Sequence, residues 1–390
     1  MKVNSPGGPV SLYLHFPFCV RKCRYCDFLS GPASEEDRDN YIDLLCEEIR
    51  LRSREVTGPV DTVFFGGGTP SLMTAAQMRR LMECLEETLA ILPDAEISME
   101  VNPGTADGMK LRAFRDSGIN RISIGVQSFD DQELQLLGRI HTSREAREIF
   151  HAAREAGFTN INLDLMSALP GQRMETWEHT LREAVGLGPE HLSAYSLIIE
   201  EGTPFASMQL PALPSEEEDR EMYHFTERFL AENGYRRYEI SNYAREGYAC
   251  RHNCGYWTGH DYLGMGLGAS SLLDGERFRN PDKMDTYREA VLRGDSAGLR
   301  QERELLRIEE QMEECMFLGL RMTDGVCTED YQRRFGEPVE KRFGQVIEKH
   351  LRQGVLCRRE VKKGEITQHR LALTGYGMDV ANYVMADYIL

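Results

Sequence analysis

The chain has 390 residues, of which 41% are hydrophobic and 28% are charged, which is typical of a soluble globular protein. Its formal net charge of −17 argues against nucleic acid as a partner, because such proteins need a basic face. No apolar run reaches the roughly 18 residues of a membrane span, and the first ten residues lack the apolar core of a signal peptide, so a cytoplasmic location is expected.

The first chemical motif is a loop with three cysteines, Cys19, Cys23 and Cys26, directly after the apolar, β-prone run 11–18. A four-iron cluster normally takes four cysteines, so three would leave one iron open to another ligand. The alternative is a structural zinc site completed by a distant residue such as His15. Zinc sites usually show paired C-x₂-C arms, and the spacing here favours the cluster.

After this loop, β-prone segments alternate with helical patterns. The strands are expected at 61–65, 96–101, 121–126, 160–166 and 191–199, and the helices at 35–55, 74–92, 107–117, 130–137, 143–156 and 175–185. With the run before Cys19 this makes six strands. Such alternation predicts an α/β fold with a parallel sheet, and six units fall short of the eight of a closed barrel. We therefore expect a partial, open (β/α)6 barrel over residues 1–200.

The alternation stops near residue 200. Residues 201–300 read as a connecting segment that is rich in Tyr and Gly toward its end. Residues 301–390 suggest two helical stretches (302–320 and 328–353), a β-ribbon and a last helix. That order predicts a smaller, mostly helical, winged-helix-like C-terminal domain.

Polar residues recur at the ends of the predicted strands. The glycine turn 66–70 follows the second strand, Glu100 and Asn102 end the third, Gln127 the fourth and Asp164 the fifth. Each of them has an ordinary explanation as a turn residue. In a β/α barrel, however, such residues line one mouth, which predicts a ligand site there. Arg139, in the loop after the fourth strand, has the geometry to bind a carboxylate.

These motifs together resemble the radical SAM enzymes of the coproporphyrinogen dehydrogenase branch. The resemblance covers nearly the whole chain. It is carried by the cysteine loop, Gly66-Gly-Gly-Thr-Pro70, Glu100-x-Asn-Pro-Gly104, Gly125-Val-Gln-Ser-Phe129, Leu137-Gly-Arg-Ile-His141 and Asn162-Leu-Asp-Leu-Met166. It implies that Cys19, Cys23 and Cys26 hold a [4Fe–4S] cluster and that S-adenosylmethionine (SAM) binds the open iron. By motif, the SAM contacts would be Tyr13, Gly67, Gly68, Thr69, Glu100, Gln127, Arg139 and Asp164, with Tyr25 beside the cluster and Ile198 near the adenine.

Two features separate a chaperone from an enzyme within this branch. Members that decarboxylate coproporphyrinogen III carry a further cysteine two residues after the third and a longer N-terminal extension. This chain has Asp27-Phe28 there and only eighteen residues before Cys19, which resembles the HemW heme chaperones. Cys250-Arg-His-Asn-Cys-Gly-Tyr-Trp257 is similar to a motif associated with heme in those chaperones.

The resemblance thus implies a heme chaperone that binds heme through His252 and passes it to heme-accepting proteins. On the residues alone, His252 is equally well explained as a hydrogen-bonded loop histidine, and Cys250 and Cys254 are alternative thiolate ligands. An oxygen-independent coproporphyrinogen III dehydrogenase, or another tetrapyrrole-directed radical SAM enzyme, remains the alternative function, and no catalytic residue is assigned. Cleavage of SAM would require an electron donor such as a flavodoxin or ferredoxin, and a homodimer is left open.

Overall fold

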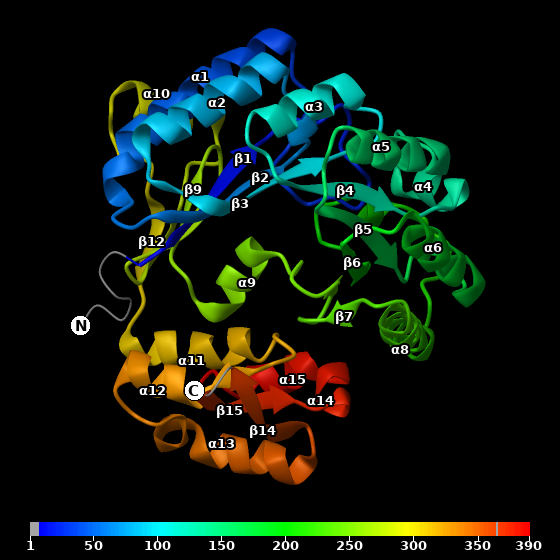
Figure 1. The fold of residues 1–390 in the computed structure, drawn as a ribbon, viewed down its shortest axis with the longest axis vertical. Helices are drawn as coiled ribbons and strands as arrows, with labels where there is room; N and C mark the ends of the chain where they lie inside the picture. The colour runs from blue at the N-terminus through cyan, green and yellow to red at the C-terminus, as the bar shows by residue number, and fades with distance from the viewer. Residues whose placement is uncertain (1–7, 364–365) are drawn as a thin grey trace.

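A computed structural model describes residues 8–363 and 366–390, so the expectation for the extreme N-terminus lies largely outside the described residues. Six parallel strands lie side by side in chain order (Figure 1). They are β1 (Val10–Phe16), β2 (Val60–Gly67), β3 (Ile91–Val101), β4 (Arg121–Gln127), β5 (Ile161–Ser167) and β6 (His191–Ser196). The predicted α/β architecture is confirmed.

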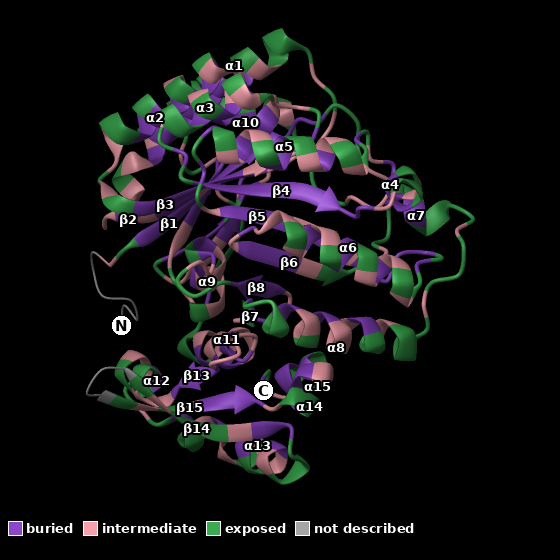
Figure 2. Cartoon of the chain, turned by 45° about the vertical axis from the view of Figure 1, so that its right-hand side comes forward, coloured by how far each residue is buried: buried purple, intermediate pink, exposed green. Residues whose placement is uncertain are grey.

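The helices between these strands pack on the outer face of the curved sheet (Figure 1). They are α1 (Glu35–Arg52), α2 (Ala75–Thr88), α3 (Gly108–Asp116), α4 (Asp131–Leu137), α5 (Ser143–Glu155) and α6 (Met174–Leu187). Figure 2 shows their buried stripes facing the sheet and their exposed stripes facing outward. Every residue of β4 is buried, as expected of a central strand covered on both faces.

The sheet continues beyond the six predicted strands. On one side β9 (Tyr262–Met265) runs parallel to β1 and is followed by β10 (Ser270–Leu273), β11 (Glu276–Arg279) and β12 (Gln301–Leu305). On the other side β8 (Asn242–Ala244) pairs antiparallel with β6, and β7 (Arg236–Arg237) pairs with β8 to form that edge of the sheet. The segment 201–300 therefore supplies strands to both sides of the barrel sheet. It also carries α7 (Pro204–Ser207), α8 (Glu216–Glu232), α9 (Arg251–Thr258) and α10 (Met284–Leu292). The boundaries near residues 200 and 300 stay predictions.

A second apolar core forms in the C-terminal part around Met316, Phe343 and Leu371. Its elements are α11 (Ile308–Gly319), β13 (Val326–Cys327), α12 (Thr328–Phe335), α13 (Val339–Gln353), β14 (Leu356–Lys363), β15 (Ile366–Leu373), α14 (Gly375–Asp379) and α15 (Ala381–Ala386). Three helices followed by the β14–β15 hairpin agree with the predicted smaller C-terminal domain. Among the described residues, no helix is long and apolar enough to cross a membrane.

Two helix predictions in this domain were wrong in detail. The expected helix 302–320 starts as strand β12, and its helical part begins only at Ile308. The expected helix 328–353 is two helices, because Gly336 ends α12 in the left-handed conformation (φ 76°) and Pro338 is the N-cap of α13.

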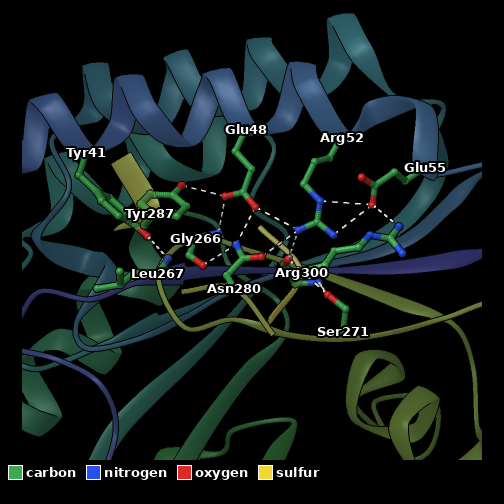
Figure 3. A network of polar contacts seen from close by, with 11 residues as sticks. Tyr41, Glu48, Arg52, Glu55, Gly266, Leu267, Ser271, Asn280, Tyr287 and Arg300 are labelled. Atoms are coloured by element: carbon green, nitrogen blue, oxygen red, sulfur yellow. Dashed lines mark hydrogen bonds and ion pairs between the residues drawn. The ribbon is translucent and has the colours of Figure 1, made fainter. Parts of the chain in front are cut away.

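A buried polar network fastens α1 to the later strands (Figure 3). The Glu48 carboxylate accepts hydrogen bonds from Arg52 and Asn280 at one oxygen, and from Tyr287 and the Gly266 amide at the other. Both Glu48 and Arg52 are fully buried. Because every strong acceptor position of the carboxylate is used, the charge is tolerated in the core.

Candidate functional site

A cavity of about 540 Å³ opens at the carboxyl ends of the parallel strands. Eleven of the fourteen predicted site residues line it: Cys19, Cys23, Tyr25, Cys26, Gly67, Gly68, Thr69, Glu100, Gln127, Arg139 and Asp164. They come from five different strand–helix units. The barrel topology therefore brings them together in space, as predicted for polar residues at successive strand ends.

The three thiols of the cysteine loop border this cavity, and all three are free. The described chain offers no set of three or more His, Cys, Asp or Glu side chains placed to hold a single metal ion. Three cysteine thiols that border one cavity suit an iron–sulfur cluster, whose irons each take one thiolate. Arg139 donates toward Cys23 Sγ at 3.5 Å, and such a cation offsets the negative charge of thiolates. The donor set thus fits the cluster.

The glycine turn after β2 has no room for side chains. Gly67 has φ of +116°, and a Cβ there would lie 2.6 Å from the His15 ring. A Cβ on Gly68 would lie 2.5 Å from the Phe18 carbonyl oxygen. Glycine is therefore required at both positions by the close approach of β1 and of the residues just after it, and it leaves backbone exposed to the cavity.

Two acidic residues, Glu100 and Asp164, line the same cavity. Burial, with a smaller contribution from the nearby Asp164, raises the pKa of Glu100 to about 8, although the Gly67 amide opposes the shift by donating to Glu100 Oε2 at 3.0 Å. Asp164 accepts hydrogen bonds from Ser123 and Asn162 at 2.8 Å each. Two carboxyl groups that interact within one cavity favour a cationic ligand there.

Asn102 was predicted to lie at the mouth of the barrel but was not among the predicted SAM contacts. It lines the cavity, its Nδ2 donates to Thr69 Oγ1 at 2.9 Å, and its Oδ1 accepts from Arg139 Nη2 at 2.6 Å. The side chain therefore links the glycine turn to the arginine beside Cys23. Its position two residues after Glu100, at a strand end, was the available signal in the sequence.

Tyr13 and Ile198 lie outside the cavity lining. The Tyr13 hydroxyl is 3.0 Å from His15 Nδ1, and His15 Nε2 in turn is 2.9 Å from the Leu29 carbonyl oxygen, so these bonds connect β1 to the segment that follows the cysteine loop. Ile198 is 71% exposed in the loop after β6. Their roles toward SAM stay predictions.

His252 lies inside the barrel on α9, stacked on Phe64 with ring centroids 5.1 Å apart. It is 1% exposed, and its two ring nitrogens lie 2.8 Å from Thr62 Oγ1 and 2.9 Å from the Tyr256 hydroxyl. Burial, with a smaller contribution from the positive charge of Arg121, lowers the pKa of His252 to about 3. In this conformation neither nitrogen is free, so ligation of heme iron by His252, which stays a prediction, requires one of these bonds to break.

Comparisons with known proteins agree with this geometry. The family described as "Radical SAM superfamily" matches residues 13–184, and the one described as "HemN C-terminal domain" matches residues 306–362. The heme chaperone HemW of Lactococcus lactis is 36% identical over 385 residues, which cover 98% of each chain. HemW of Escherichia coli is 43% identical over 263 residues, covering 67% of this chain and 69% of that protein. Among solved structures, the coproporphyrinogen III oxidase HemN of E. coli superposes with a TM-score of 0.84 at 25% identity, covering 98% of this chain and 91% of that one.

Proposed function

This chain belongs to the HemW heme chaperone family of the radical SAM superfamily, and on that premise we propose that it binds heme and transfers it to heme-accepting proteins. The observation that carries the proposal is the similarity to HemW of L. lactis over 98% of both chains. Asp27 and Phe28, which follow the third cysteine, also support the proposal. The decarboxylating enzymes of this branch carry a further cysteine at the position of Phe28.

Membership of the radical SAM superfamily implies a [4Fe–4S] cluster and SAM. Cys19, Cys23 and Cys26 would hold the cluster, whose chemistry when bound is the supply of one electron to SAM. The glycine turn presents its backbone to the ligand, Glu100 and Asp164 supply negative charge for the cationic sulfonium, and Arg139 is positioned near the cluster thiol of Cys23. An electron donor such as a flavodoxin or ferredoxin is a partner only if SAM is cleaved.

A second candidate function is oxygen-independent conversion of coproporphyrinogen III. The structural match to HemN over nearly the whole chain favours it. Against it stands Phe28, because this position lacks the additional cysteine expected of the decarboxylating enzymes.

One anaerobic experiment separates the two functions. Protein with a reconstituted cluster is incubated with SAM and reductant, and either heme or coproporphyrinogen III is added. The chaperone function predicts a Soret band for bound heme and its passage to an added apo-hemoprotein, with the porphyrinogen unchanged. Formation of protoporphyrinogen IX would contradict the proposal. The Cys19→Ser, Cys23→Ser and Cys26→Ser triple variant, which should lack the cluster absorbance, is the control.

A further inference from the structure

The Asp164 carboxylate in the cavity is held by a row of buried polar side chains. Asn162 and Asp164 lie two residues apart on β5, so their side chains share one face of the strand. Asn162 Nδ2 donates to Asp164 Oδ1 at 2.8 Å. The register of β5 and β6 places His191 opposite Asn162, and His191 Nδ1 lies 2.6 Å from Asn162 Oδ1. Asn162 is 1% exposed and His191 is 0% exposed, so bulk water does not compete for these bonds.

The same row continues from His191 to the start of α9. His191 Nε2 lies 2.8 Å from the Tyr238 hydroxyl, and the Cys250 backbone N–H donates to that hydroxyl oxygen at 3.3 Å. Cys250 is the N-cap residue of α9. Four consecutive hydrogen bonds therefore connect the carboxylate in the cavity to the beginning of this helix.

The two ends of this chain of bonds determine where every proton in it lies. A carboxylate can only accept a hydrogen bond, and a backbone N–H can only donate one. Asn162 must therefore present its amide N–H to Asp164 and its carbonyl oxygen to His191. This requires a proton on His191 Nδ1 and leaves Nε2 to accept the proton of the Tyr238 hydroxyl. Burial, with a smaller contribution from the charge of Arg121, lowers the pKa of His191 well below its ordinary value, which agrees with a neutral ring that carries one proton.

We propose that His191 and Tyr238 are positioning residues for Asp164 in the SAM site. Both lie outside the cavity lining, so they act through Asn162. The proton on Nδ1 holds the Asn162 amide in the orientation that donates to one carboxylate oxygen, and Ser123 Oγ donates to the other at 2.8 Å. The carboxylate thus keeps one orientation before SAM binds, which reduces the ordering cost of binding. This role rests on the proposed function, because SAM is the ligand that it serves.

The test measures the tautomer of His191 and the SAM affinity of anaerobic, cluster-loaded protein. Long-range proton–nitrogen NMR spectra of histidine-labelled protein should show a neutral His191 with its proton on Nδ1, and His191→Leu identifies its signals by their loss. Tyr238→Phe removes the hydroxyl that fixes this proton, so the Asn162 amide is free to turn its oxygen toward the carboxylate. The Kd for SAM, measured by calorimetric titration, should rise about fivefold in Tyr238→Phe. It should rise about tenfold in His191→Leu, and both variants should keep the cluster absorbance.

Tyr235→Phe is the matched control, because it removes another buried tyrosine hydroxyl, which donates to the Pro189 carbonyl oxygen at 2.7 Å. It should change neither the Kd for SAM nor the His191 signals. A proton on His191 Nε2 in the wild type would overturn the proposal, and so would wild-type SAM affinity in Tyr238→Phe, which decides alone if circular dichroism shows that His191→Leu does not fold. A wild type that binds no SAM would overturn the proposed use of SAM and the positioning role with it, whereas SAM binding that the variants leave unchanged would overturn the positioning role alone.

Discussion

At the residue scale, Glu100 gives the site its pH dependence. Its pKa of about 8 means that the carboxyl is mostly protonated at pH 7 in the absence of a ligand. A cationic sulfonium beside it favours the ionised form, so binding of SAM should release a proton below pH 8.

We expect the Kd for SAM to fall as the pH rises from 6 to 8, by at most about tenfold per pH unit, and to level off above pH 8. Calorimetric titration of cluster-loaded protein in buffers of different ionisation enthalpy measures both the affinity and the proton release. Glu100→Gln should bind more weakly and lose this dependence. A Kd that is constant from pH 6 to 8 in the wild type would contradict the assignment.

His252 has a structural role that any test of heme ligation must take into account. His252→Ala removes hydrogen bonds to Thr62 and Tyr256 and opens a cavity beside Phe64. We expect it to lower the free energy of unfolding by about 2–4 kcal/mol, measured by urea denaturation. Tyr256→Phe, which removes one hydroxyl, should cost only about 1 kcal/mol.

The same histidine predicts how stability depends on pH. The folded-state pKa of His252 is lowered to about 3 from 6.5, so the unfolded chain binds a proton that the folded protein does not bind between these values. Its contribution to stability is therefore lost as the pH falls from 6.5 toward 3. An unchanged stability of His252→Ala at pH 7 would show that α9 is held by other contacts, chiefly those of its first amides with Glu96.

At the scale of elements, Asn102 joins three loops of the barrel mouth. Its side chain bonds to Thr69 after β2 and to Arg139 after α4, and its backbone N–H donates to Ser71 Oγ at 3.1 Å. A side chain that orients two predicted SAM contacts would act through them, so we assign it a positioning role.

Asn102→Ala should weaken SAM binding by about 10- to 100-fold and leave the cluster absorbance intact. The spectrum of the reduced cluster with and without SAM measures both effects in one sample. Asn233→Ala is the control, since within residues 8–363 and 366–390 the Asn233 side chain bonds only to the Phe229 carbonyl oxygen at the end of α8. Loss of the cluster in Asn102→Ala would instead show that Arg139 is needed to hold Cys23.

The elements also show what the sequence could and could not predict. The six strands of the barrel were predictable because each is a largely buried, β-prone run in a chain that alternates with helical patterns. The polar residues that follow these strands were predicted to share one site, and they line the cavity. β12 was mistaken for helix because its residues Gln301–Leu305 are mostly charged and all exposed, so no alternation of burial marks the strand. The burial of His252 follows from the packing of α9 inside the barrel, which joins residues about 190 positions apart and leaves no local signal.

At the scale of the whole molecule, the network around Glu48 and Arg52 connects the first helix to the strands that extend the sheet beside β1. It connects α1, near the start of the chain, to Gly264, Gly266 and Asn280, which lie among the strands β9–β11 added beside β1 (Figure 3). Arg300 extends it by donating to Glu55 at 2.8 Å, and Glu55 also accepts from Arg52.

Arg52→Met would leave the Glu48 carboxylate buried without its cation, so we expect a loss of about 3–5 kcal/mol in the free energy of unfolding. Because the network is the polar link between α1 and the added strands, limited proteolysis should cut the variant first between β10 and β12. The double variant Arg52→Met, Glu48→Leu should recover part of the loss, since it removes the unpaired charge together with its partner. The exposed pair Arg80–Asp43 provides the matched control, and Arg80→Met should cost at most about 1 kcal/mol. Equal losses for Arg52→Met and Arg80→Met would mean that apolar packing alone joins β9 to β1.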